Sequence, residues 1–192
     1  GRPKGVLLDH HGQVWMIDKI VKSRDIQQDD CSVISAPLYH KNALLAVKSA
    51  LSAGGRIVIF SRFDAKQYIQ AIERYKLTML TGVPTMYALI LQEEKLLDST
   101  DLSSVRNCSM GSAPASDSLL DNLAARFPKA KLNLNYGITE GGPILFAWSH
   151  PEGLPRPRMS VGFPIEGVEI KLVGGPDENQ GVLHVRSPGV MK

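Results

Sequence analysis

The feature that most constrains the fold is a regular alternation of short apolar runs and longer amphipathic stretches between residues 31 and 135. The short runs, such as Cys31 to Ser35 and Arg56 to Phe60, are of strand length, whereas the stretches between them carry apolar residues at helical spacing. Alternation of strand and helix requires crossover connections, which join parallel strands. The pattern therefore predicts an α/β fold with a largely parallel sheet flanked by helices on both faces.

Several of these elements have recognisable start signals. Asp64, followed three residues later by Gln67, and Ser116 have side chains that can cap a helix, and Pro84 suits a first helical position. We expect helices after Asp64, from Ser116 to about residue 127, and over residues 42–53 and 84–93. Strands are expected at residues 31–35, 56–60, 78–81, 105–109 and 131–135.

The pattern changes after Tyr136. Strands expected at residues 144–148, 168–173 and 181–187 are separated by turns rich in proline and glycine, without helices. We therefore divide the chain into an α/β part, residues 1–143, and a β-rich part, residues 144–192, of the same domain.

Composition narrows the function. Hydrophobic residues make up 43% of the chain and charged residues 21%, which suits a domain with a buried core. The net charge of +3 comes from scattered Lys and Arg, which argues against nucleic-acid binding. No apolar run reaches the roughly 20 residues of a membrane-spanning helix, and no signal region opens the chain, so we expect a cytoplasmic protein.

The ends of the chain suggest a longer protein. The sequence begins at Gly1 rather than Met and ends at Lys192 without a helix cap or polar tail. We therefore expect an internal piece, and faces exposed by such truncation would favour self-association. Cys31 and Cys108 lie far apart in apolar segments and are expected to be buried free thiols.

Three loops that follow predicted strands carry chemically useful side chains, namely 37–40, 111–114 and 135–140. Ligands of open parallel sheets bind at the carboxyl ends of the strands. In the third loop, Tyr136 could stack on a nucleobase, Thr139 could donate to a phosphate oxygen, and Glu140 could hold Mg²⁺, which prefers one or two carboxylates plus substrate phosphate. The same loop also fits an ordinary strand-to-loop corner with glycine at its turn.

Other catalytic patterns are missing from the sequence. His10 and His11 are adjacent at an expected helix start, where neighbouring side chains point about 100° apart and cannot easily share a metal. The chain has no H-E-x-x-H, G-x-S-x-G or paired C-x-x-C motif. These observations argue against zinc enzymes and serine hydrolases.

Six segments in order resemble the adenylate-forming superfamily, which comprises acyl-CoA synthetases, luciferases and peptide-synthetase adenylation domains. They span the whole chain, and their order is more specific than any one motif. The segments are Gly1-Arg2-Pro3-Lys4-Gly5-Val6, Pro37-Leu38-Tyr39-His40, Gly111-Ser112-Ala113-Pro114, Tyr136-Gly137-Ile138-Thr139-Glu140, Ser160-Val161-Gly162-Phe163-Pro164 and Gly181-Val182-Leu183-His184-Val185-Arg186-Ser187-Pro188. The resemblance implies part of the large N-terminal domain of an AMP-forming acyl-CoA synthetase, with ATP, Mg²⁺ and CoA as cofactor and co-substrates.

The resemblance also implies roles for particular residues. Thr139 would contact the α-phosphate, Glu140 would position Mg²⁺, and His40 would border the acyl pocket and the path of the CoA thiol. Lys4 would approach the β- and γ-phosphates, although a terminal segment is also expected to fray. The nucleotide would further contact the glycines beside Lys4 and the two later loops, that is Gly1, Gly5, Gly111, Ser112, Ala113, Pro114, Asn135, Tyr136 and Gly137.

The family pattern is incomplete in this chain. The front of the phosphate loop, the downstream Asp for the ribose hydroxyls and the mobile domain with its catalytic Lys are missing, so we expect the piece alone to be inactive. Asn42-Ala43 replaces a Gly often seen after the His40 segment.

The substrate and the reaction leave alternatives open. Met79, Val83 and Met86 favour a fatty acid, although the same residues would also serve as core. The alternatives are an aryl-CoA ligase, a domain that loads a carrier protein, or a non-catalytic nucleotide-binding or scaffold domain.

Overall fold

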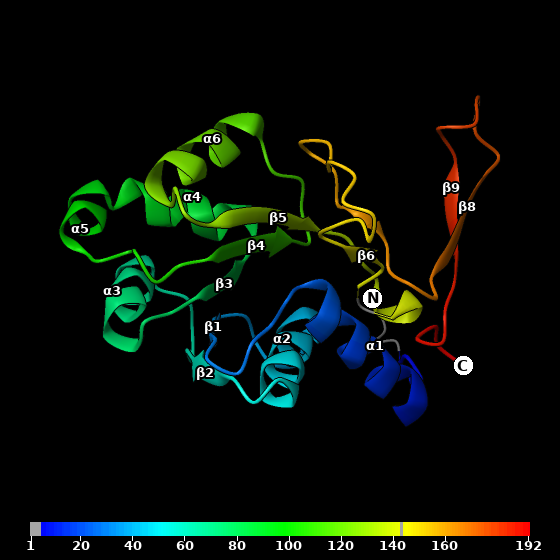
Figure 1. The fold of residues 1–192 in the computed structure, drawn as a ribbon, viewed down its shortest axis with the longest axis horizontal. Coiled ribbons are helices and arrows are strands. Elements are labelled where there is room, and N and C mark those ends of the chain that lie inside the picture. The colour runs from blue at the N-terminus through cyan, green and yellow to red at the C-terminus, as the bar shows by residue number, and fades with distance from the viewer. Residues whose placement is uncertain (1–4, 143) are drawn as a thin grey trace.

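The largest element of the fold is a five-stranded sheet with the strand order β2-β1-β3-β4-β5 (Figure 1). We describe residues 5–142 and 144–192 from a computed structural model of the chain. Every neighbouring pair of strands in the sheet is parallel, which confirms the predicted α/β fold. The strands are β1 (Cys31–Ile34), β2 (Arg56–Ile59), β3 (Met79–Gly82), β4 (Asn107–Gly111) and β5 (Lys131–Asn135).

Within the large sheet, only β4 differs clearly from its predicted bounds, since the sequence pattern placed it at residues 105–109. Val105 lies in a turn, where its amide donates to the Leu102 carbonyl at 3.1 Å, and its side chain is part of the buried core. The strand instead ends in Ser109, Met110 and Gly111, all of which are buried. The apolar side chain of Val105 therefore marks the core rather than the strand.

The helices lie on both faces of the sheet, as their connections require. The chain runs from β1 to β2 through α2 (Lys41–Ser52) and then reverses direction across the sheet. Right-handed crossovers then place α2 on one face and the later helices on the other. Figure 1 shows this division, with α1 and α2 below the sheet and α4 and α6 above it. The other helices are α1 (His10–Ser23), α3 (Ala65–Tyr75), α4 (Pro84–Gln92), α6 (Asp117–Arg126) and the short α5 (Glu94–Ser99), which was not predicted.

Side-chain caps fix the start of three helices. Asp64 Oδ1 accepts from the Gln67 amide at 2.9 Å, and Ser116 Oγ accepts from the Leu119 amide at 3.2 Å, as predicted. Asp9 caps α1 in the same way. Each such cap stabilises a helix by about 0.5–2 kcal/mol. Pro84 occupies the first turn of α4 without a side-chain cap.

Two hydrophobic cores hold the chain together. The larger lies between the sheet and helices α3, α4 and α6, and it contains both cysteines as free thiols. Its two buried tyrosines are satisfied by backbone carbonyls, with Tyr68 Oη donating to Thr81 O at 3.0 Å and Tyr87 Oη donating to Ser109 O at 3.1 Å. The second core joins α1 and Leu45 of α2 to the segments that follow β5, through Met16, Ile20, Leu145, Phe146 and Ile165.

The remaining strands form two small antiparallel pairs. Strand β6 (Phe146–Ala147) pairs with β7 (Phe163–Pro164), a strand that was not predicted. Strands β8 (Glu169–Val173) and β9 (Val182–Arg186) form a hairpin that stands apart from the large sheet in Figure 1. All five residues of β8 are exposed. Among the described residues, no helix is both long and apolar enough to cross a membrane.

Candidate functional site

A cleft of about 360 Å³ lies at the carboxyl edge of the large sheet. The chain reverses direction between β1 and β3, so the loops that leave these neighbouring strands diverge, and such a reversal is where open α/β sheets bind ligands. Four strands contribute their carboxyl ends to the lining, through Ala36 after β1, Val83 after β3, Gly111 of β4 and Asn135 of β5. The cleft is therefore a product of the strand order itself.

Two further segments complete the wall of the cleft. One is the start of α2, and the other is the loop after β5, where a 3₁₀ turn covers Thr139–Gly141. The cleft brings together six of the residues predicted for nucleotide binding or catalysis, namely His40, Gly111, Ser112, Asn135, Gly137 and Thr139. Ile138 and Ile144 also line it.

The corner after β4 depends on a close backbone approach. Gly111 pairs in register with Asn135, and a Cβ atom at Gly111 would lie 3.0 Å from the Asn135 carbonyl oxygen. Ser112 then turns the chain with a φ of 67°, a left-handed conformation that is uncommon outside glycine. Ala113 and Pro114 follow in an exposed loop and do not line the cleft.

Asn135 is held by two side chains from distant parts of the chain. Its Oδ1 accepts from Trp148 Nε1 at 2.8 Å and from Arg24 Nη2 at 3.0 Å. The Arg24 guanidinium also lies 4.6 Å from the centre of the Trp148 ring, in a cation–π contact. These contacts fix the Asn135 side chain at the wall of the cleft.

The loop after β5 presents its polar groups in different ways. Thr139 lines the cleft, whereas Tyr136 and Glu140 do not. Tyr136 is 40% exposed as a residue, and its ring packs edge-on against Phe146, with 5.9 Å between the ring centres. The Glu140 backbone carbonyl accepts from the Met191 amide at 2.8 Å. Within the described ranges, the Glu140 carboxylate has no hydrogen bond or ion pair, so it is available to a cation.

Near the cleft, the protein offers few side chains that could bind Mg²⁺. Among residues 5–142 and 144–192, no group of three or more His, Cys, Asp or Glu side chains could enclose a metal ion. One exposed carboxylate fits Mg²⁺ only where a substrate phosphate and water supply the other oxygens. Glu140 matches that requirement.

His40 occupies the N-cap position of α2, but its side chain makes no capping hydrogen bond. Its backbone amide instead donates to the Pro37 carbonyl at 2.9 Å, and its ring lies against Tyr39 with 4.8 Å between the ring centres. The exposed imidazole therefore borders the cleft without a competing role in capping the helix.

Some predicted residues lie elsewhere. Gly1 and Lys4 fall outside the described residues, and Gly5 is exposed and does not line the cleft. Of the three apolar residues proposed for an acyl pocket, only Val83 lines the cleft. Met79 begins β3 at the opposite edge, is 6% exposed and contacts Asn107, while Met86 packs against the larger core. These two methionines are core residues because β3 starts at Met79 and α4 turns Met86 onto the core.

Lys41 is a cleft residue that the sequence reasoning missed. It is the first residue of α2, and its Nζ donates to the Gln13 side chain of α1. Burial, together with the nearby Lys48, lowers the pKa of Lys41. The sequence does contain a signal for Lys41 as a site residue, because it is a lysine directly after the corner between a predicted strand and a predicted helix. Its partner on α1 lies 28 residues away and carries no such signal.

Three comparisons with known proteins bear on this site. A family model described as AMP-binding enzyme matches residues 1–192. The whole chain is 38% identical to 4-coumarate–CoA ligase 1 of Solanum tuberosum and covers 37% of that protein. The chain thus spans less than two fifths of this curated relative.

Two solved structures share the fold. The chain superposes with a TM-score of 0.81 on O-succinylbenzoate coenzyme A synthetase of Bacillus subtilis, solved with ATP and magnesium ion, at 27% identity over 100% of this chain and 40% of that one. The superposition on a long-chain-fatty-acid-CoA ligase of Archaeoglobus fulgidus gives a TM-score of 0.83 at 23% identity, over 99% of this chain and 40% of that one. The second likeness concerns the fold alone.

Proposed function

The chain belongs to the AMP-binding enzyme family, and from this premise we propose that it is the nucleotide-binding part of an AMP-forming acid:CoA ligase. The observation that carries the proposal is the cleft, because it gathers residues of three separate motifs at the carboxyl ends of four parallel strands. Family membership and the position of the cleft point to the same ligand. ATP would bind at this edge of the sheet.

We assign the parts of ATP to the walls of the cleft by their chemistry. The exposed loop Ser112–Pro114 and the half-exposed ring of Tyr136 would hold adenine, with Gly111, Asn135 and Gly137 shaping the floor beneath it. Thr139 would donate its hydroxyl to the α-phosphate. Gly1, Lys4 and Gly5 remain our proposal for the β- and γ-phosphates.

The proposed reaction has two steps. A substrate carboxylate oxygen attacks the α-phosphorus of ATP, the bond to the bridging oxygen breaks, and pyrophosphate leaves. A CoA thiol then attacks the carbonyl carbon of the acyl-adenylate, the thiol proton passes to solvent or a base, and AMP leaves. Magnesium held by Glu140 would offset phosphate charge, and Thr139 would stabilise the charge that grows on the α-phosphate.

His40 would serve the acyl group or the thiol rather than the nucleotide. Its ring borders the cleft from the start of α2, on a different loop from the adenine residues. In a whole enzyme, His40→Ala should leave ATP affinity nearly unchanged and lower the rate of CoA-ester formation. A large loss of ATP affinity with an unaltered thioester rate would contradict this assignment.

For the acid, we propose an apolar carboxylic acid, with a fatty acid as the first candidate. Ala36, Val83 and Ile144 give the cleft apolar surface, and Lys41 and Asn42 add polar groups. An aryl acid is the second candidate, because the curated relative is a 4-coumarate–CoA ligase. The acceptor is a separate question, and for it a carrier-protein thiol is the alternative to CoA.

The test is a pyrophosphate-exchange assay on a whole enzyme that contains this chain, with a panel of fatty and aryl acids at equal concentration. Exchange that depends on an acid supports the ligase, and the acid with the highest kcat/KM identifies the class. CoA and carrier protein are then compared as acceptors. If no acid supports exchange while ATP still binds, the chain belongs to a non-catalytic nucleotide-binding protein instead.

We further propose that residues 1–143 and 144–192 form one domain, because the second core joins α1 and α2 to β6 and the segment after it. The piece alone should not turn over substrate. In a melting experiment, Mg-ATP should raise the melting temperature of the whole enzyme but scarcely that of residues 1–192. A full shift for this chain by itself would show that it holds the complete nucleotide site.

A further inference from the structure

A second cavity, of about 410 Å³, lies against the face of β4 and β5 that the larger core leaves uncovered. Alternate residues of these strands, among them Asn107 and Asn133, give this face polar side chains, while Cys108 and Leu132 point to the core. Four cationic side chains line the cavity, and they are Arg24, Arg106, Lys131 and Arg156.

The four cations differ in how their charge is balanced. Arg106 has its counter-ion, the buried carboxylate of Asp30. Arg24 and Arg156 have none among the described residues. Arg24 donates to Asn135 Oδ1, and Arg156 donates to Asn133 Oδ1 at 2.9 Å and to the Leu132 carbonyl at 2.6 Å. Within residues 5–142 and 144–192, every acceptor of these two guanidinium groups is therefore neutral.

Burial makes this imbalance costly. Arg24 as a residue is only partly exposed, and its Nε atom is buried without a hydrogen-bond partner in the described structure. Burial lowers the pKa of Arg24 to about 10 and also lowers the pKa of Arg156. Charges removed from water are normally paired. Apart from the cation–π contact between Arg24 and Trp148, no group offsets the two positive charges in the described part of the chain. Two guanidinium groups in one cavity without a carboxylate partner thus favour an anionic ligand.

The shape and number of the donors indicate the class of anion. A guanidinium group is donor-only, and its planar fork matches the oxygens of a phosphate group. The exposed Lys131 adds a third positive charge, and Asp25 is the one carboxylate among the residues that line the cavity. An Asp25 oxygen already accepts from the Gln27 side chain. The cavity therefore has several donors for an anion and little that would repel it.

We propose that this cavity is a second binding site, in which Arg24 and Arg156 hold a phosphate group. Its lining residues differ from those of the nucleotide cleft, but the two sites are linked, because Asn135 lines the cleft and accepts a hydrogen bond from Arg24 of the cavity. The phosphate could come from a free anion, such as phosphate or pyrophosphate, or from a phosphate ester such as CoA. The proposal does not depend on the ligase activity.

The test uses the 192-residue chain and isothermal titration with inorganic phosphate, pyrophosphate and CoA at constant ionic strength. Arg24→Met and Arg156→Met each remove one guanidinium group. Arg62→Met is the matched control, since Arg62 is an exposed arginine that does not line the cavity. Circular dichroism checks the fold of each variant, and Arg156→Met keeps the test decisive if Arg24→Met does not fold.

We expect saturable binding of at least one of the three ligands, weakened at least tenfold in the cavity variants and unchanged in Arg62→Met. Binding of phosphate or pyrophosphate without CoA would assign the site to a free anion. Binding of CoA that phosphate displaces would assign it to the phosphate of the ester. The proposal is overturned if none of the three ligands binds, or if the folded cavity variants bind as tightly as the parent chain.

Discussion

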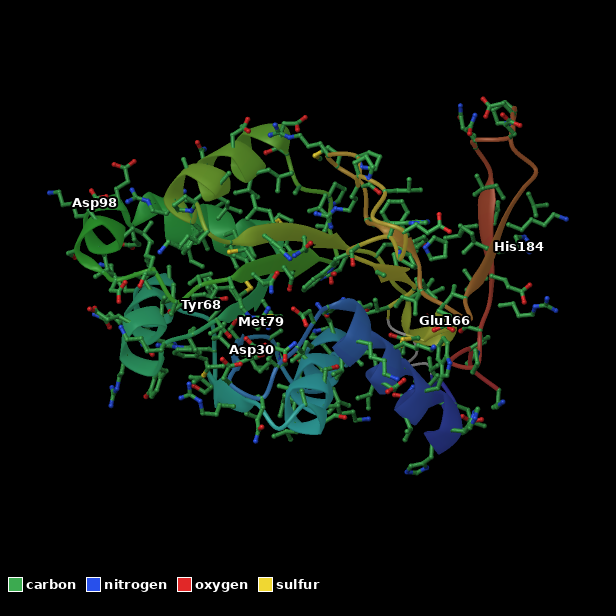
Figure 2. The ribbon with its side chains drawn as sticks, viewed as in Figure 1. Asp30, Tyr68, Met79, Asp98, Glu166 and His184 are labelled. Atoms are coloured by element: carbon green, nitrogen blue, oxygen red, sulfur yellow. The ribbon has the colours of Figure 1, made fainter. Side chains whose placement is uncertain are left out.

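The two edges of the large sheet make opposite use of their polar side chains. At the amino edge, Asp30 accepts hydrogen bonds from Arg106, from Thr78 Oγ1 at 2.6 Å and from the Gln27 amide at 2.7 Å. Thr78 Oγ1 in turn accepts from the Cys31 amide at 3.0 Å, so this network ties β1, β3 and β4 together. Figure 2 shows Asp30 beside Met79, the first residue of β3.

At the carboxyl edge, some polar groups have no such partners in the described structure. His40 makes no side-chain cap, and Ser112 is exposed in a left-handed turn. Buried polar groups need hydrogen-bond partners within the protein, whereas polar groups that line an open cleft can bond to water until a ligand replaces it. The comparison indicates that the amino edge contributes stability and the carboxyl edge contributes binding, although both edges belong to the same strands.

The largest expected effect on stability belongs to the amino edge. Asp30→Ala removes one partner of a buried ion pair, which typically costs about 3–5 kcal/mol. We expect a loss near the lower end of that range, because the Arg106 side chain keeps 34% of its exposure and can reach water. Urea unfolding measures the change.

The control is Asp101→Ala, which breaks the exposed ion pair between Lys76 and Asp101. Exposed pairs contribute little. An Asp30→Ala variant that is no less stable than Asp101→Ala would end the distinction between the two edges.

The largest expected effect on catalysis is of similar size and belongs to the carboxyl edge. In a whole enzyme, Thr139→Ala should slow pyrophosphate exchange, because losing a donor to a developing negative charge usually raises the activation free energy by about 2.7–4 kcal/mol. Urea unfolding of the same variant should change little, because Thr139 lines the cleft rather than a core. Thr139→Ser restores the hydroxyl and should recover most of the rate. A normal rate in Thr139→Ala would exclude Thr139 from the mechanism.

Gly111→Ala should affect both properties, because Gly111 lies in the sheet and at the cleft. The added Cβ would lie 3.0 Å from the Asn135 carbonyl oxygen and 3.1 Å from the Asn135 Cβ, so β4 and β5 must move apart. Overpacking of this kind costs about 1–3 kcal/mol. Gly5→Ala is the control, since no atom of the described residues lies within 4 Å of its added Cβ. Equal stability of the two variants would show that the corner tolerates a side chain.

The smallest effect is a pH dependence at the amino edge. Burial raises the pKa of Asp30, but hydrogen bonds from Arg106, the Gln27 amide and Thr78 outweigh it, and the net pKa is lowered. A carboxyl group with a lowered pKa in the folded state contributes stability above its unfolded pKa of about 3.9. That contribution is lost as the pH falls through the folded pKa. Below about pH 4, Asp30→Ala should therefore lose stability less steeply than the parent chain, and parallel curves would contradict this.

The sequence predicted the parts of the molecule that depend on local order. The alternation of strands and helices is predicted by the spacing of apolar residues close together in the sequence. The rule that ligands bind at strand carboxyl ends then placed His40, Gly111 and Thr139 near one cleft. Contacts between distant segments carry no such local signal. Arg24 meets Asn135 across 111 positions and Arg106 meets Asp30 across 76, so neither pair could be found from spacing. Met79 was misplaced because an apolar residue of a predicted strand has the same sequence pattern whether it faces a core or a pocket.

The β8–β9 hairpin has a consequence for the motions of the chain. The five residues of β8 are all exposed, and Figure 2 shows His184 of β9 away from the large sheet. Its described contacts are its own ladder, the ion pair between Glu169 and Arg186, and the partly buried Leu183 and Val185 of β9, which pack against the second core. Segments of this kind open without the rest of the molecule. In deuterated water, the amides of the hairpin should therefore exchange long before those of β1 and β4, whose hydrogen bonds break only when the whole sheet unfolds.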